Sequence, residues 1–342
     1  MSLVSVKVLF PSRMSGRAIA SISALWGVSS FLGPFIGALF ADYASWRFGF
    51  LFFTLQACLL SALILASRLP PSTGKDTVKN PRFPAVRLCW LSAAVASVAW
   101  AGIQNSALPT LFFVCAGIVM LAVFLWLDSQ AGDARLLPSR PINLRNPPGA
   151  ALIMLFGFAA STIALGLYGP ILMIRIHDIS VLQAGCLLLA ESVSWSIMAI
   201  AISGVTARHD PLMIAIGMTM VFASVVCLAW AVPFGPIWLI AVGAIIQGGG
   251  FGVSWTFVLR RATALAEQDD ALRVAGGMPT IQRLGYAFGA AYVGIVANAS
   301  GIATMSDGSS AQGIAACVYS ACLAPAAIGL IAMVWFVRAR AD

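Results

Sequence analysis

The sequence predicts an all-α polytopic membrane protein, and three observations support this fold class. Apolar residues make up 60% of the 342 residues and charged residues only 9%, with a mean hydropathy of +0.94. Soluble globular domains are about half apolar and about a quarter charged. The apolar residues also form runs long enough to cross a bilayer, which takes roughly 20 residues, and short charged connections separate these runs.

Ten apolar runs are predicted to be transmembrane helices. They span residues 18–40, 47–66, 88–106, 109–127, 150–173, 182–204, 211–231, 236–258, 279–299 and 314–337. If the N-terminus is cytoplasmic and the runs alternate in direction, all 20 basic residues except Arg47 and Arg175 fall on the cytoplasmic side. Basic residues gather on that side of membrane proteins. The pattern therefore favours ten spans and two cytoplasmic termini, and it explains the net charge of +8 without a nucleic-acid partner.

Two connections are longer than the others and divide the chain into blocks. Residues 67–87 and 128–149 are basic and rich in proline, which predicts cytoplasmic linkers. They separate a two-helix block (1–66), a central helical pair (88–127) and a six-helix block (150–342). A shorter charged connection inside the last block is expected to be solvated. Its charged residues are Arg260, Arg261, Glu267, Asp269, Asp270 and Arg273.

The first run carries a helix face of small residues. Ser29, Gly33, Gly37 and Ala41 recur at every fourth position, so a neighbouring helix can approach the backbone closely. Pro34 lies in this face, removes a backbone donor and bends the helix. Taken alone, these residues indicate a kinked packing helix of a polytopic membrane protein.

The same stretch resembles the antiporter motif of the major facilitator superfamily, and in particular of its fourteen-helix drug:proton antiporters. The motif Gly-x-x-x-Gly-Pro-x-x-Gly-Gly falls on Ser29, Gly33, Pro34, Gly37 and Ala38, where serine and alanine replace two glycines. The acidic residue and Trp-Arg pair that follow the motif correspond to Asp42, Trp46 and Arg47. FPSRMSGRAIAS resembles the connection before the family's fifth helix, ARLLPSRPINLRNPPGAAL the connection before its ninth, and MPTIQRLGYAFGAAYVGIV its thirteenth helix.

This resemblance has several implications. It runs from the family's fifth helix to its fourteenth, so we expect the chain to lack the first four helices and 1–66 to be the remnant of an N-terminal bundle. It implies two bundles that rock about a central site and export amphipathic drugs against proton entry. It also implies a bacterial inner (plasma) membrane and no cofactor beyond the proton gradient. The motif face would limit leakage by packing against the opposite bundle, and the alternative is that it only permits tight packing.

Glu191 is the candidate proton-coupling or substrate-binding residue. It lies nine residues into the run 182–204, near the middle of the bilayer. An ionised carboxylate is costly at that depth, so the group is either protonated at rest or faces a wet cavity or a partner. A carboxyl group that changes protonation as the cavity opens to each side is what proton-coupled export requires. The alternative is a protonated glutamic acid that makes one interhelical hydrogen bond.

Polar residues at mid-depth of other runs are candidates for the lining of a substrate cavity. Gln247 comes directly before a glycine cluster that brings backbone near a cavity or, alternatively, only packs against other helices. The other candidates are Trp255, Tyr168, Ser161 and Thr162. The seven cysteines and two histidines form no metal-ligand pattern, and no nucleophile lies near a base, so neither a metal site nor an enzyme is predicted.

The leading functional hypothesis is a proton-coupled exporter of small amphipathic organic compounds or drugs, whose partners are the substrate, protons and the bilayer. Two alternatives remain. The chain could be a truncated, transport-inactive or regulatory membrane protein, or it could be a metabolite importer or uniporter.

Overall fold

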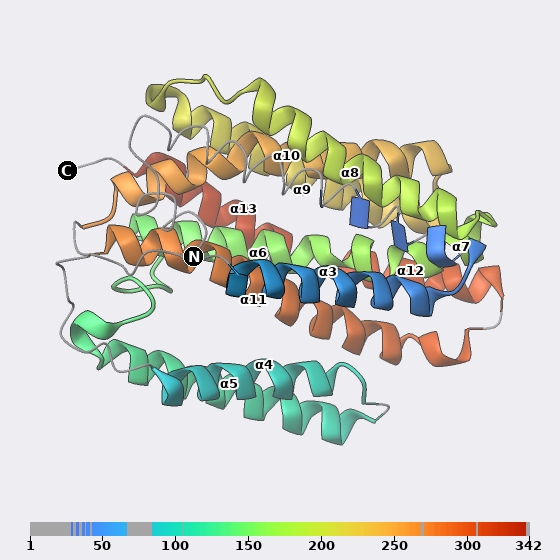
Figure 1. Ribbon diagram of the computed structural model, residues 1–342, viewed down its shortest axis with the longest axis horizontal. Coiled ribbons are helices and arrows are strands. Elements are labelled where there is room, and N and C mark those ends of the chain that lie inside the picture. Colours follow the sequence, from blue (N-terminus) through green and yellow to red (C-terminus); the bar gives the residue numbers. More distant parts are fainter. Residues whose placement is uncertain are drawn as a thin grey trace.

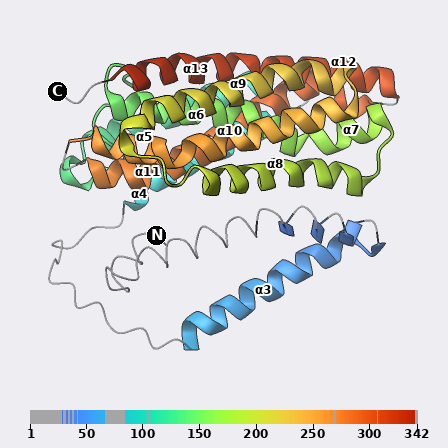
Figure 2. The same ribbon diagram turned by 90° about the horizontal axis from the view of Figure 1, so that it is seen from above.

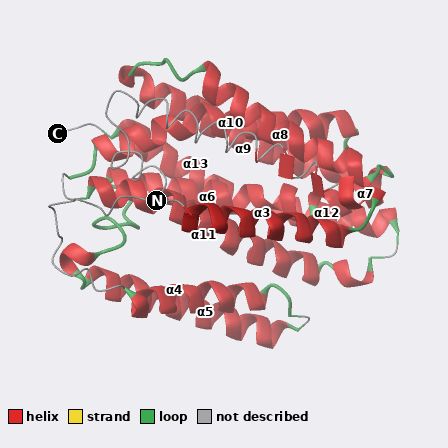
Figure 3. Ribbon diagram, in the orientation of Figure 1, coloured by secondary structure: helices red, strands yellow, loops and turns green. Residues whose placement is uncertain are grey.

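The computed structural model describes residues 29, 32–33, 36–37, 39–41, 43–66, 84–104, 106–267, 270–305 and 307–339. Every regular element in these residues is a helix (Figure 3), so the predicted all-α fold is confirmed. The α-helices are α3 (Trp46–Ala66), α4 (Ala85–Ala101), α5 (Ala107–Ser129), α6 (Pro147–Leu167), α7 (Gly169–His177), α8 (Val181–Ala201), α9 (Asp210–Phe234), α10 (Ile237–Ala264), α11 (Ala271–Ala299), α12 (Gly308–Ala321) and α13 (Leu323–Arg338). Single 3-10 turns are η1 (Gly132–Ala134), η2 (Ala207–His209) and η3 (Ile302–Thr304).

Seven helical stretches in the described part of the chain are long and apolar enough to cross a membrane. They are Trp46–Ala66, Ala107–Ser129, Pro147–Leu167, Val181–Ala201, Ala207–Phe234, Ile237–Ala264 and Gly308–Arg338. The predicted runs from 47–66 onward each coincide with one helix or with two helices in line, whereas most of the run 18–40 lies outside the described residues. The count of ten spans stays a prediction, because α4 has only 17 residues and α11 carries polar side chains within its length.

Three helices extend at one end by six or more residues beyond the apolar runs that predicted them. α10 continues to Ala264 instead of ending at 258, α11 begins at Ala271 instead of 279, and α12 begins at Gly308 instead of 314. The residues added to α12 (GSSAQG) are polar and those added to α10 (LRRATA) include two arginines, whereas those added to α11 (ALRVAGGM) are mostly apolar with one arginine. The start of α12 has a local cause, since the carboxylate of Asp307 accepts a hydrogen bond from the amide of Ser310 at 2.9 Å.

The predicted run 150–173 consists of two helices in line, α6 and α7. The break falls at Tyr168, next to Gly169 and Pro170. Proline has no amide hydrogen and disfavours helical geometry in the residue before it, which accounts for the interruption. α12 and α13 are likewise separated at Cys322.

The helices α6 to α13 pack as six helical units, counting α6 with α7 and α12 with α13 as one each (Figures 1 and 2). Large buried side chains such as Phe158, Phe251 and Phe336 fill the interior between them. Some helices approach each other closely because glycine has no side chain at the contact. A Cβ atom at Gly289 of α11 would lie 2.5 Å from the backbone of Ala160 of α6. These contacts hold the helices that carry the candidate site residues.

The pair α4 and α5 lies beside α11, on the outside of the six-unit bundle (Figure 1). At one end of the pair, the side-chain amide of Asn298 donates to the carbonyl of Gly102 at 2.6 Å. A Cβ atom at Gly102 would lie 3.2 Å from the backbone of Ala291 in α11. The pair is therefore in direct backbone contact with the bundle.

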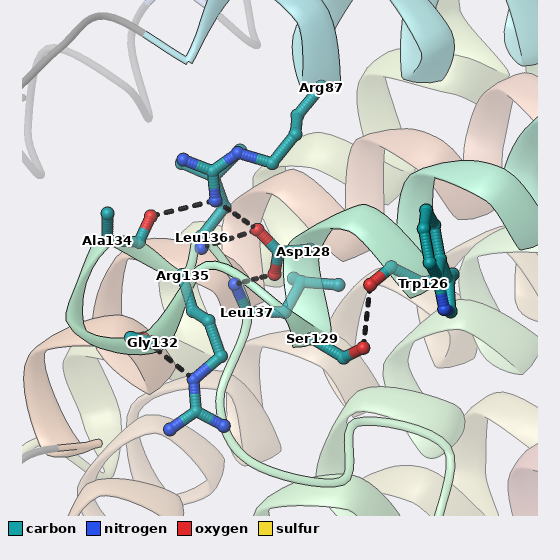
Figure 4. Close-up of polar contacts among 9 residues, drawn as sticks. All are labelled: Arg87, Trp126, Asp128, Ser129, Gly132, Ala134, Arg135, Leu136 and Leu137. Carbon is teal, nitrogen blue, oxygen red and sulfur yellow. Dashed lines mark hydrogen bonds and ion pairs between the residues drawn. The ribbon is translucent and has the colours of Figure 1, made fainter.

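At its other end, the pair is held by a buried carboxylate, Asp128 (Figure 4). Arg87 of α4 donates to Asp128 Oδ1 at 2.6 Å and to the carbonyl of Ala134 at 2.8 Å. The amides of Leu136 and Leu137 donate to the two carboxylate oxygens at 2.9 and 3.0 Å. Asp128 is 3% exposed, so it joins both helices of the pair to the connection that follows them. We call this end of the molecule the linker end.

The same connection continues to the start of α11. The amide of Ser139 donates to Asp270 Oδ2 at 2.7 Å, and Arg273 donates to Asp270 Oδ1 at 2.7 Å. Burial alone would raise the pKa of Asp270, but the hydrogen bonds from Ser139 and Arg273 outweigh it and hold that pKa below its usual value.

The expectation that the charged connection is solvated is wrong for Asp270, and Asp269 lies outside the described residues. Asp270 is 4% exposed, and Arg260 pairs with Asp210 of α9 through an Nε to Oδ2 distance of 3.0 Å. Asp210 itself is 3% exposed. Sequence spacing could not show these pairs, because Asp210 and Ser139 come from distant parts of the chain. Glu267 is exposed, as expected.

α3 stands apart from the six-unit bundle (Figure 2). Only Gly49 is buried among its residues, and large apolar side chains such as Phe50 (69% exposed) and Leu55 (62% exposed) are open on its surface. Just before α3, a Cβ atom at Gly33 or Gly37 would have no described neighbour within 4 Å.

Candidate functional site

Glu191 is the middle residue of α8, and its position follows from how that helix begins. Ser180 and Gln183 form a reciprocal capping box, in which Ser180 Oγ accepts from the amide of Gln183 at 3.1 Å and Gln183 Oε1 accepts from the amide of Ser180 at 2.9 Å. This cap defines the first turn of the helix. The apolar residues that follow extend the helix, so Glu191 lies midway between its ends.

The carboxylate of Glu191 is bound by Gln247 of α10. Gln247 Nε2 donates to Glu191 Oε1 at 2.8 Å, and Gln247 is 1% exposed. On the far side of the amide, Gln247 Oε1 lies 3.5 Å from Ser224 Oγ of α9. No cation of the described residues forms an ion pair with Glu191. Its hydrogen-bond partner is a neutral amide, which leaves the carboxyl group able to exist in either protonation state.

Glycines allow α8 and α10 to meet at this point. A Cβ atom at Gly248 would lie 1.9 Å from the carbonyl oxygen of Glu191, and one at Gly252 would lie 2.3 Å from that of Trp195. No side chain fits at such distances. Of the two interpretations of the glycine cluster, close helix packing therefore describes these two positions, and this packing brings Gln247 within reach of Glu191.

Three predicted cavity residues come together at a small internal cavity. Ser161 and Thr162 of α6 and Gln247 of α10 line it, and they are 3%, 6% and 1% exposed. The cavity volume is about 10 Å³, which is too small for an organic substrate.

The structure places Trp255 and Tyr168 elsewhere. Trp255 packs near Trp195, with 6.5 Å between ring centroids, and Trp195 in turn stacks on Phe251 at 5.1 Å. Tyr168 lies at the break between α6 and α7, where its hydroxyl would be 3.5 Å from a Cβ atom at Gly294 of α11. Neither Trp255 nor Tyr168 lines the small cavity.

Part of the motif stretch can be placed. Ser29, Gly33 and Gly37 are helical, whereas Pro34, Ala38 and Asp42 lie outside the described residues. Trp46 is 58% exposed, and the Arg47 guanidinium lies 4.6 Å from the centre of its ring.

Sequence reasoning missed Tyr319 and Ser224, which the fold brings next to Gln247. Tyr319 of α12 lines the cavity and is 3% exposed. A phenol within the apolar run 314–337 was a signal that could have identified it, since buried tyrosine hydroxyls usually need a partner. Ser224 gave no comparable signal, because isolated serines are common in membrane helices.

Comparison with known proteins identifies the family. A model of the Major Facilitator Superfamily matches residues 1–289. A probable multidrug-efflux transporter of Mycobacterium tuberculosis is 26% identical over 301 residues, which cover 84% of this chain and 63% of that protein. An uncharacterized transporter of Escherichia coli, YebQ, is 25% identical over 307 residues, 86% of this chain and 65% of the relative.

A third relative, the multidrug efflux pump SdrM of Staphylococcus aureus, is 22% identical over 259 residues, 75% of this chain and 56% of that protein. The chain thus spans less than two thirds of the length of these three relatives. Since the family model covers most of its length and apolar helices make up its fold, the chain is an integral membrane protein that belongs to the Major Facilitator Superfamily.

Proposed function

We propose that this protein exports small amphipathic organic compounds in exchange for protons, and that Glu191 is the residue that takes up and releases the proton. The observation that carries the proposal is the environment of Glu191: a carboxyl group at the middle of a membrane-spanning helix whose hydrogen-bond partner is the neutral amide of Gln247. An intramembrane carboxyl group without a fixed counter-ion can change protonation during transport. The names of the efflux relatives support export as the direction.

The proposal also assigns an arrangement in the cell. Residues 150–342 act as the C-terminal bundle, 88–127 as a central pair and 1–66 as part of the N-terminal bundle, with 67–87 and 128–149 as linkers. The protein lies in a bacterial inner membrane with both termini in the cytoplasm. The small face of the motif stretch seals against the opposite bundle, and Trp255 and Tyr168 line the substrate path.

The test is a transport assay in lipid vesicles. The purified protein is reconstituted with a pH-sensitive dye in the lumen, and amphipathic fluorescent compounds are added in the presence of a proton gradient. We expect compound-dependent proton flux with wild-type protein and none with Glu191→Gln. Glu267→Gln is the matched control, because it makes the same chemical change in an exposed connection. Unchanged proton flux with Glu191→Gln would contradict the role of Glu191.

A second candidate function is a transport-inactive or regulatory membrane protein. The observation that favours it is α3, whose apolar side chains remain open to the surroundings in the described part of the chain. The same vesicles separate the two functions. Proton flux that depends on an added compound excludes the inactive protein, whereas its absence across the whole compound panel favours it.

A further inference from the structure

The small cavity inside the six-unit bundle has the size and the polar lining of a binding site for one water molecule. It lies among α6, α9, α10 and α12, and its volume is about 10 Å³. A single buried water needs a space of roughly this size and two to four polar partners. The polar side chains of the lining are Ser161, Thr162, Gln247 and Tyr319, each at most 6% exposed.

The hydroxyl group of Tyr319 points to an additional ligand. Its oxygen is buried and has no hydrogen-bond partner among the residues that the structure describes. Buried hydroxyl groups in folded proteins nearly always have a partner, because losing water without replacing its hydrogen bonds is costly.

The donors and acceptors around the cavity match one water. Ser161 Oγ and Thr162 Oγ1 donate their hydrogens to the carbonyl of Phe158 at 2.9 and 2.8 Å, so only their lone pairs remain available. Gln247 donates to Glu191, which leaves its Oε1 as an acceptor on the cavity side. Tyr319 supplies the free donor. A water that accepts from Tyr319 and donates to Gln247 and to one hydroxyl makes three hydrogen bonds, the usual number for a buried water.

We propose that a single water molecule binds in this cavity and joins Tyr319 to Gln247, so that a hydrogen-bonded chain runs from Tyr319 of α12 through Gln247 of α10 to Glu191 of α8. In this chain the Tyr319 hydroxyl, the water and the Gln247 amide each donate toward Glu191. Donors that align in this way strengthen one another and favour the ionised carboxylate. Tyr319 is therefore a positioning residue for the proton site, and this role rests on the proposed function of Glu191.

Other titratable and charged groups around Glu191 can also influence its protonation. Tyr286 of α11 and Tyr319 of α12 lie close enough to Glu191 to interact with its charge. Arg283, one helical turn before Tyr286, interacts electrostatically with Tyr286. The cationic side chains on the helices packed against α8 lie near helix ends. These are Arg175 and His177 of α7 and Arg260 and Arg261 of α10.

The experiment measures the titration of Glu191 without measuring transport. Infrared difference spectra of the purified full chain are recorded across pH, and the carboxyl band of Glu191 is identified by its loss in Glu191→Gln. We expect Tyr319→Phe to move the half-point of this band to higher pH by about 0.5 unit, because one donor of the chain is lost. The matched control is Tyr292→Phe, since the Tyr292 hydroxyl donates to the carbonyl of Ala321 at 3.3 Å and lies outside the cavity lining.

A half-point that is the same in Tyr319→Phe and in Tyr292→Phe would overturn the proposal. If Tyr319→Phe does not fold, an experimental structure that resolves ordered waters decides: density within hydrogen-bond distance of both Tyr319 Oη and Gln247 Oε1 supports the site, and an empty cavity refutes it. These outcomes are separable from the proposed function. A shifted band without proton-coupled flux would contradict only the transport proposal, and proton-coupled flux without a shifted band would contradict only the water site.

Discussion

Asp128 and Glu191 are both bound carboxyl groups in this protein, but their surroundings differ in one decisive respect. Asp128 accepts hydrogen bonds from the Arg87 guanidinium and from two backbone amides. Glu191 accepts one from the neutral side chain of Gln247. A cation within 3 Å balances the charge of Asp128 in a single arrangement. Glu191 has no such counter-ion among the described residues, so a proton can take its place.

The difference shows how one residue type serves two purposes. At the linker end, the ion pair between Arg87 and Asp128 joins two helices and a connection. This structural role requires that both groups stay charged and in contact. At the middle of α8, the weaker set of partners is suited to a group that changes state. Exchanging the partners of the two carboxyl groups is therefore the most direct way to test the comparison.

The largest effect is expected from placing a cation beside Glu191. Gln247→Lys would supply the counter-ion that Asp128 already has and would hold Glu191 in its ionised form. We expect compound-dependent proton flux in vesicles to fall to background while the protein still inserts into the membrane. Retained flux in Gln247→Lys would show that Glu191 does not need to be protonated.

The converse change removes the cation from Asp128. Arg87→Gln leaves a buried carboxylate with a neutral partner, and breaking a buried pair in this way costs about 3–5 kcal/mol. We expect a lower thermal unfolding midpoint for the purified protein in detergent. Arg135→Gln is the matched control, because Arg135 lies in the same connection and, among the described residues, donates to the carbonyl of Gly132 rather than to a carboxylate. Equal midpoints for the two variants would mean that the pair with Asp128 contributes nothing.

A smaller effect is expected from separating α8 and α10 without changing any charge. Gly248→Ala places a methyl group against the backbone of Glu191, where overpacking costs about 1–3 kcal/mol. The helices must move apart, so the hydrogen bond from Gln247 should lengthen and both stability and proton flux should decrease. Gly204→Ala serves as control, since a Cβ atom at Gly204 would have no described neighbour within 4 Å. Wild-type behaviour of Gly248→Ala would contradict the close contact.

The smallest effect concerns the pH dependence of Asp270. Its pKa is lowered in the folded protein, so its hydrogen bonds stabilise the fold above the usual carboxyl range of about pH 4 and lose this effect as pH falls further. Asp270→Asn should therefore be less stable than wild type near pH 6. Thermal unfolding measured at several pH values should show this difference shrinking below about pH 4. A difference that does not depend on pH would exclude titration of Asp270 as its cause.

Much of this protein could be predicted from local sequence. The helices from α3 onward follow from apolar runs of membrane-spanning length, and the mid-helix position of Glu191 follows from counting along its run. The motif stretch indicated the family before any comparison, and residues 1–289 match that family. Helix ends were less accurate, as at Gly308, because a polar turn outside the apolar run carries no hydropathy signal.

The partners of the key side chains depended on tertiary structure. Glu191 binds Gln247, Tyr319 lines the same cavity as Gln247, and Asp270 binds the Ser139 amide. Each of these contacts joins residues that are distant in sequence. Which segments form long apolar helices is set by composition along the chain, so the sequence alone determined it. Which side chains meet is set by helix rotation and by close contacts such as that at Gly248, and only the packed bundle decided this.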